Sequence, residues 1–64
     1  MTVFLPSGRT LRTRTKARYI LVRDDPRSGG PPWIGYYTDG LHLAEQRRLP
    51  NDIIMDLTTG LVVR

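Results

Sequence analysis

The chain has 64 residues, of which 39% are hydrophobic, and its ten Lys and Arg side chains outnumber six Asp and Glu to give a formal net charge of +4. A chain of this length has room for a single domain, residues 1–64, which buries only about 60% of the surface exposed in its unfolded form. With no cysteine and His42 as the one histidine, the composition excludes disulfides and thiolate chemistry and argues against a zinc site, so we predict no metal and no cofactor.

The positive charge is concentrated in the first half of the chain. Residues 1–32 carry seven cations and two acids, a net charge of +5, whereas residues 33–64 carry three cations and four acids, a net charge of −1. Nine of the ten cations are arginine, which suits bidentate contact with phosphate or carboxylate, although a GC-rich genome would enrich arginine in the same way. No apolar run approaches the ~18 residues of a membrane span, and the first residues lack a secretory pattern. We therefore expect a cytoplasmic protein with no membrane partner.

The first predicted element is a basic hairpin over residues 2–18. Pro6, Ser7 and Gly8 separate two short apolar segments, and pairing Leu5 with Arg9 would place Val3 opposite Leu11. The second strand then alternates cations with Thr13, Thr15 and Ala17; the cations are Arg12, Arg14, Lys16 and Arg18. A strand points alternate side chains to opposite faces, so these cations would share one outward face, roughly 6.6 Å apart. On a helix they would scatter to two sides, and threonine is a poor helix former.

The middle of the chain predicts two further strands. "YILVR" (residues 19–23) is apolar at both parities, which indicates a central strand covered on both faces after a bend or bulge near Ala17. "DDPRSGGPP" (residues 24–32) is a loop by its proline, glycine and charge content. "WIGYYT" (residues 33–38) is the next strand, and Gly35 within it indicates a bulge or a close approach.

The last third predicts a helix and a second hairpin. A short helix over about residues 40–49 would begin with Asp39 as its N-cap, bury Leu41 and Ala44 on one face and end before Pro50. Residues 52–63 form a hairpin, in which Asp56 can bond the turn backbone and Gly60 can supply a positive φ. The predicted class is α+β and β-rich: a small antiparallel sheet, or a partly open barrel, of about five to six short strands with one short helix.

The sequence contains no set of residues suited to catalysis. A hydroxyl nucleophile needs a base and a group that orients the base, and His42 is more simply interpreted as a surface or boundary residue. Asp24 and Asp25 adjoin a proline-glycine loop, and we interpret them as turn formers. "SGGPP" matches no phosphate-binding motif. We therefore predict that the protein is not an enzyme.

The row of cations allows three interpretations. A core cannot absorb these cations. They form a solvated face that discourages aggregation, contact an acidic protein surface, or contact the phosphates of nucleic acid. Base stacking would require exposed aromatic rings. We expect Trp33 and one of Tyr36 and Tyr37 to lie in the core, with the other tyrosine pointing outward. The predicted site is a set of anion-binding cations with aromatic side chains for stacking or interface contact: Arg9, Arg12, Arg14, Lys16 and Arg18, with Trp33, Tyr36 and Tyr37.

Three hypotheses follow. The favoured one is a small binding module that contacts nucleic-acid phosphates through its basic N-terminal strand, with up to about five phosphates neutralised. The alternative is a small protein-binding modulator or inhibitor of a larger machine, because small, basic, cysteine-free domains are the size of many phage-encoded proteins that disable host or defence machinery. That likeness is one of scale and composition alone. Self-association into a homo-oligomer is a third hypothesis.

Overall fold

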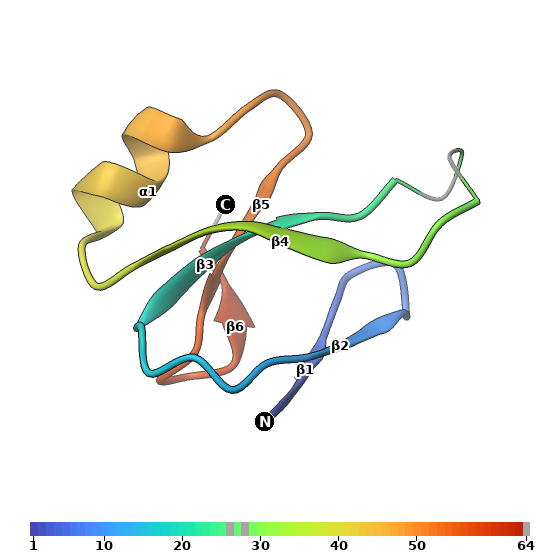
Figure 1. The fold of residues 1–64 in the computed structure, drawn as a ribbon, viewed down its shortest axis with the longest axis horizontal. Helices are drawn as coiled ribbons and strands as arrows, with labels where there is room; N and C mark the ends of the chain where they lie inside the picture. Colours follow the sequence, from blue (N-terminus) through green and yellow to red (C-terminus); the bar gives the residue numbers. More distant parts are fainter. Residues whose placement is uncertain (26, 28, 64) are drawn as a thin grey trace.

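The structure is a computed structural model that describes residues 1–25, 27 and 29–63 (Figure 1). The described chain forms two antiparallel sheets: a two-stranded sheet, β1-β2, and a four-stranded sheet with the order β4-β3-β5-β6. The β-rich α+β class is thus confirmed, with the strands divided between two sheets. The elements in chain order are β1 (Thr2–Phe4), β2 (Thr10–Arg12), β3 (Tyr19–Arg23), β4 (Trp33–Thr38), α1 (Leu41–Arg47), β5 (Ile53–Asp56) and β6 (Leu61–Val62).

Strand β3 is central, as its sequence predicts, and both of its faces are buried. Ile20 and Val22 face the N-terminal hairpin and pack in one cluster with Val3, Leu5, Met55 and Leu57. Tyr19 and Leu21 face the other side and pack with Ala44 of the helix and Ile54 of β5. The β1-β2 hairpin and the helix therefore cover opposite faces of the four-stranded sheet, which we call the hairpin face and the helix face.

The N-terminal hairpin has the predicted register but ends early. Val3 pairs with Leu11, and the N–H of Leu5 donates to the carbonyl of Arg9 at 2.9 Å. Strand β2 ends at Arg12, so the prediction of one strand through residue 18 is wrong. The last hydrogen bonds of the hairpin join Met1 and Thr13, each of which donates its N–H to the carbonyl of the other. Beyond them, the N–H groups of Thr15 and Ala17 bond to side chains and not to a neighbouring strand.

Threonine side chains bond the backbone of the segment that follows. The hydroxyl of Thr13 accepts the N–H of Thr15 at 3.3 Å, and the hydroxyl of Thr15 accepts the N–H of Ala17 at 3.1 Å. Short hydroxyl side chains commonly satisfy backbone groups two residues away in this manner. The alternation of threonine with cations thus supports an unpaired segment rather than a strand.

The bulge predicted at Gly35 is confirmed, and it changes which side chains share a face. Leu21 pairs with Tyr36 and Val22 with Ile34, so the register shifts by one residue at Gly35. Ile34 consequently packs on the hairpin face while Tyr36 packs on the helix face. Trp33, which pairs with Arg23, comes to the same helix face as Tyr36, because cross-strand partners point to the same side of a sheet.

The helix is shorter than predicted and has a different N-cap. Gly40 occupies the cap position with no side-chain cap bond, so the assignment of Asp39 as N-cap is wrong. The carboxylate of Asp39 instead accepts the backbone N–H of Arg18 at 2.9 Å, a donor that lies far away in the sequence. Leu41 and Ala44 contact the sheet as predicted.

The C-terminal hairpin forms as predicted. The carboxylate of Asp56 accepts the N–H of Thr58 at 2.9 Å, and Gly60 has a φ of 75°. Strand β6 occupies one edge of the sheet and β4 the other. Over the described residues, helix α1 is too short to cross a membrane, and no longer apolar helix is present.

Candidate functional site

The alternation of inward and outward side chains between residues 12 and 18 is present even though the segment is not a strand. Arg12, Arg14, Lys16 and Arg18 are all exposed. The side chains between them turn inward: Thr13 is buried, and Thr15 and Ala17 are half-buried. The sequence therefore predicted the outward face correctly from its period of two.

Arg9 does not belong to that free surface, because it holds the hairpin against the β3–β4 loop. Its guanidinium lies 3.0 Å from the carboxylate of Asp24, whose side chain is only 1% exposed. Arg9 also donates to the carbonyl of Gly30, and the hydroxyl of Ser7 donates to the same aspartate. A buried carboxylate needs a partner of opposite charge, so this arginine is committed within the protein.

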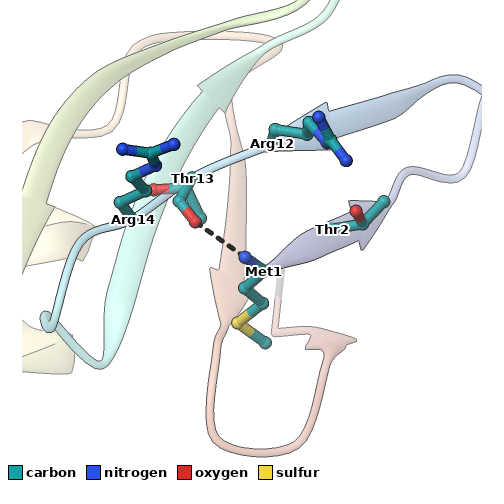
Figure 2. Close-up of a pocket in the computed structure, with 5 residues that line it drawn as sticks. All are labelled: Met1, Thr2, Arg12, Thr13 and Arg14. Atoms are coloured by element: carbon teal, nitrogen blue, oxygen red, sulfur yellow. Dashed lines mark hydrogen bonds between the residues drawn. The ribbon is translucent and has the colours of Figure 1, made fainter.

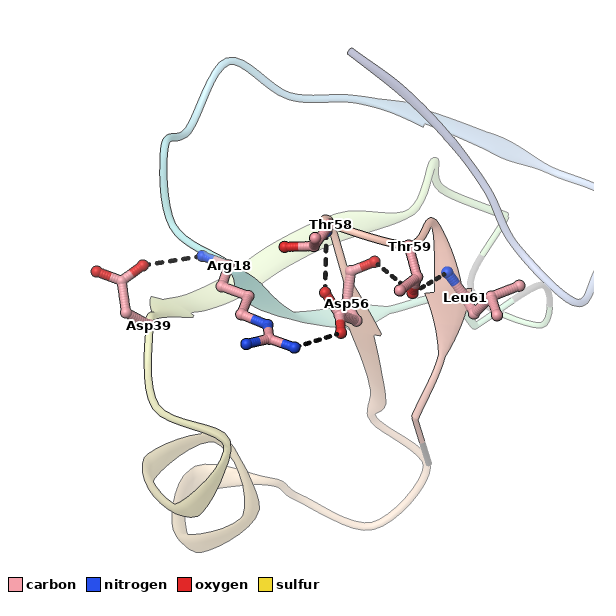
Figure 3. A network of polar contacts seen from close by, with 6 residues as sticks. All are labelled: Arg18, Asp39, Asp56, Thr58, Thr59 and Leu61. Carbon is pink, nitrogen blue, oxygen red and sulfur yellow. Dashed lines mark hydrogen bonds and ion pairs between the residues drawn. The ribbon is translucent and has the colours of Figure 1, made fainter.

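Arg18 is committed in the same way at the other end of the segment (Figure 3). Its guanidinium lies 3.4 Å from the carboxylate of Asp56 and stacks over the ring of Tyr19, 5.1 Å from the ring centre. Its backbone N–H donates to Asp39 at 2.9 Å, and its carbonyl accepts the N–H of Leu57 at 2.7 Å. Arg9 and Arg18 thus anchor the two ends of the basic segment.

The environment of Asp56 stabilises its charged form. Burial by itself raises the pKa of the Asp56 carboxyl, but hydrogen bonds from the Thr58 backbone and from Arg18, the charge of Arg18 and the Thr59 backbone outweigh it. The net pKa is lower than the ordinary value of an aspartate. The carboxylate is therefore charged over the whole neutral range and fixes Arg18 in place.

Three cations remain between the two anchors. Arg12, Arg14 and Lys16 are exposed and make no ion pair within 4.0 Å among the described residues. Arg12 and Arg14 line a pocket of about 490 Å³ with Met1, Thr2 and Thr13. Figure 2 shows Arg12 and Arg14 on either side of Thr13. The structure thus reduces the predicted set of five cations to three that can meet a partner.

The aromatic side chains divide differently from the prediction. Trp33 is 50% exposed, so its assignment to the core is wrong. Tyr36 is half-buried and packs against the helix-face cluster, whereas Tyr37 is 51% exposed, which confirms that one tyrosine points in and the other out. Trp33 is exposed because it lies on an edge strand, at the end of the sheet that the short helix does not reach.

Two arginines that the sequence did not single out accompany these rings. The guanidinium of Arg23 lies 4.8 Å from the ring centre of Trp33, and that of Arg47 lies 5.3 Å from the ring centre of Tyr36. Arg23 is also bonded to the buried carboxylate of Asp52 at 3.1 Å. Gly35 indicated a bulge in the sequence. That this bulge places Trp33 and Tyr36 on the same face of the sheet follows only from the pairing of β4 with β3.

Groups suited to metal or acid–base chemistry do not gather in the part of the chain that the structure describes. No cluster of three or more His, Asp or Glu side chains there could hold a metal ion. His42 is exposed and lies 3.2 Å from the amide of Gln46, one helical turn away. Comparison with known proteins finds no matching family model and no significantly similar curated protein or solved structure.

Proposed function

We propose that the protein binds nucleic acid by contacting phosphates with Arg12, Arg14 and Lys16. The observation that carries this proposal is the division of charge along the basic segment. The three aspartates with buried side chains each pair with one arginine outside residues 12–16: Asp24 with Arg9, Asp56 with Arg18 and Asp52 with Arg23. The three cations between the anchors have no such acid, so their charge is available to an external anion.

The anchored backbone favours this surface as a binding site. Both ends of the segment are held by ion pairs, at Arg9 and at Arg18, and threonine hydroxyls accept two of its backbone N–H groups. A segment that is already ordered loses less conformational entropy when it binds. Contacts to phosphates give affinity without reading sequence, so the proposed binding is sequence-independent.

The salt dependence of binding tests the proposal. For three phosphate contacts, the logarithm of the binding constant should fall with the logarithm of salt concentration at a slope of about −2.7 on duplex DNA. Replacing Arg12 and Arg14 together by alanine should weaken binding at low salt and reduce the slope to about −0.9. Fluorescence anisotropy of a labelled oligonucleotide measures both quantities.

A matched variant separates local contact from net charge. Arg27→Ala with Arg48→Ala removes the same charge from two exposed arginines outside the segment, and it should leave the slope close to that of the unmodified protein. Equal losses for the two double variants would mean that only net charge matters. Absence of binding at low salt would refute the proposed function.

A second candidate function rests on the edge of the sheet at β6. Leu61, Val62 and Val63 are all exposed there, and among the described strands β6 pairs only with β5. An exposed apolar edge can accept a strand from another protein, including a second copy of this chain. A protein that co-purifies after nuclease treatment and is lost on Leu61→Lys would favour this function, whereas capture that disappears with nuclease favours the first.

A further inference from the structure

A second pocket lies on the helix face, on the opposite side of the four-stranded sheet from the N-terminal hairpin. Its volume is about 390 Å³, within the range typical of sites for small molecules. Leu21 and Tyr36 contribute from the sheet, and Leu49 comes from the chain beyond the helix. The polar side chains around it are Arg23, Gln46 and Arg47.

The Gly35 bulge builds this pocket. Because the register shifts at Gly35, Trp33 and Tyr36 lie on one face although they are three residues apart, a spacing that would put them on opposite faces of a regular strand. The Trp33 ring lies alongside Gly35, where an added Cβ would meet it at 3.7 Å. Tyr36, with Arg47 over its ring, therefore lines the cavity. Trp33 lies next to it, in contact with Arg23 and Gly35, which both line the cavity.

The charges around the pocket favour an anion. Asp52 is buried and bonds the Nε of Arg23 at 3.1 Å, which fixes that guanidinium over the Trp33 ring. Arg47 makes no ion pair within 4.0 Å among residues 1–25, 27 and 29–63. The two arginines and one aspartate that line the pocket leave a net charge of +1. Guanidinium groups bind phosphate with charge-assisted hydrogen bonds, and aromatic rings and guanidinium planes stack on flat heterocycles.

We propose that this pocket binds a nucleotide, with its base stacked beside Trp33 and Arg23 and its phosphate on Arg47. The nucleotide is either free or one unit of a single strand, because both present the same base and phosphate. This site is separate from Arg12, Arg14 and Lys16, so it does not depend on the proposed function.

The fluorescence of Trp33 tests the proposal, because it is the only tryptophan in the chain and its ring lies against Arg23 and Gly35, two residues that line the pocket. Titration with adenosine monophosphate and with uridine monophosphate should change its emission in a saturable manner. Adenosine without phosphate and inorganic phosphate should each bind about tenfold or more weakly, since each lacks one half of the recognised group. No saturable change with either nucleotide would overturn the proposal, as would equal affinity for inorganic phosphate.

Variants of neighbouring arginines supply the control. Arg47→Gln should weaken nucleotide binding about tenfold or more, whereas Arg48→Gln, an exposed neighbour that does not line the pocket, should leave it unchanged. Circular dichroism establishes that both variants are folded. If Arg47→Gln unfolds the protein, the NMR shift of the Trp33 indole N–H on adding nucleotide to the unmodified protein decides instead. Equal effects of the two variants, or an unmoved indole signal, would overturn the site.

Two further arms identify the source of the nucleotide and separate this inference from the proposed function. A hexanucleotide that binds more tightly than the monophosphate, and still depends on Arg47, would assign the site to a single strand; equal affinities would assign it to the free nucleotide. Arg12→Ala with Arg14→Ala should leave monophosphate binding unchanged. If oligonucleotides bind through those two arginines while the monophosphates fail to bind, only the pocket proposal is overturned.

Discussion

Among individual residues, three buried aspartates determine which arginines are free. Asp24, Asp52 and Asp56 have side chains that are 1%, 6% and 11% exposed, and each pairs with one arginine. Removing one partner of such a pair leaves a buried charge uncompensated and destabilises the fold strongly. The partner arginines are therefore required for stability, and charge alone could not distinguish them from the arginines available to a ligand.

The lowered pKa of Asp56 predicts an acid-sensitive component of stability. Because the pKa is lower in the folded state than in the unfolded chain, the contribution is fully present above the ordinary carboxyl range and is lost as pH falls through it, below about pH 5. Asp56→Asn should reduce the free energy of unfolding at neutral pH and flatten its decline in acid. Urea unfolding at a series of pH values measures both effects.

Thr58→Ala is the matched control for this prediction. It keeps the backbone N–H that donates to Asp56 and removes only an exposed side chain, so the decline in acid should persist. If Asp56→Asn retains the full decline of the unmodified protein, other groups are responsible for the acid sensitivity.

Among the elements, the β5–β6 hairpin depends on one glycine. Gly60 has a φ of 75°, a conformation that costs other residues roughly 1 kcal/mol or more. Gly60→Ala should therefore lower the free energy of unfolding by about 1 kcal/mol, as measured by urea denaturation. Gly35→Ala is a suitable comparison, because Gly35 has no positive φ and an added Cβ would make only an ordinary contact. A larger loss for Gly35→Ala than for Gly60→Ala would contradict this account.

The elements that the sequence predicted well are those determined by neighbouring residues. The turn at Gly60, the apolar run of β3 and the register of Val3 with Leu11 each follow from short patterns. The failures involve distant partners. Asp39 does not cap the helix, because its carboxylate accepts the backbone N–H of Arg18, 21 residues away in the sequence. Trp33 was assigned to the core because the sequence does not reveal that β4 is an edge strand.

The outward-facing cations of the candidate site could likewise be predicted, because a pattern of neighbouring residues determines them. The period of two in Arg12, Arg14 and Lys16 identified the outward side chains without requiring a paired strand. Their separation from Arg9 and Arg18 depends on aspartates brought close by the fold. The pocket near Trp33 could not be predicted, because it forms only when the Gly35 bulge, the helix and the chain between α1 and β5 come together.

In the molecule as a whole, both halves of the core depend on β3. Ile20 belongs to the hairpin-face cluster, and Leu21, the next residue, belongs to the helix-face cluster. Ile54 of β5 pairs with Leu21. Because one five-residue strand supplies both clusters, neither the hairpin nor the helix retains its packing surface if the sheet opens. We therefore expect the protein to unfold in a single cooperative transition.

Removing one methylene from each side of the sheet tests this expectation. Ile20 and Ile54 are fully buried on opposite faces, so Ile20→Val and Ile54→Val should each lower the free energy of unfolding by about 1 kcal/mol. Leu61→Val removes the same group from an exposed strand position, and its effect should stay within about 0.5 kcal/mol.

Urea denaturation followed both by Trp33 fluorescence and by far-ultraviolet circular dichroism distinguishes one transition from two. Trp33 reports on the helix face, at its pairing with Arg23, whereas circular dichroism reports on the backbone of the entire chain. The two curves should coincide for the unmodified protein and shift together in both isoleucine variants, because loss of packing on either face destabilises β3. If Ile20→Val moved the dichroism curve and left the fluorescence curve in place, the hairpin would unfold separately. The basic segment would then lose its anchored backbone while the pocket beside Trp33 remained intact.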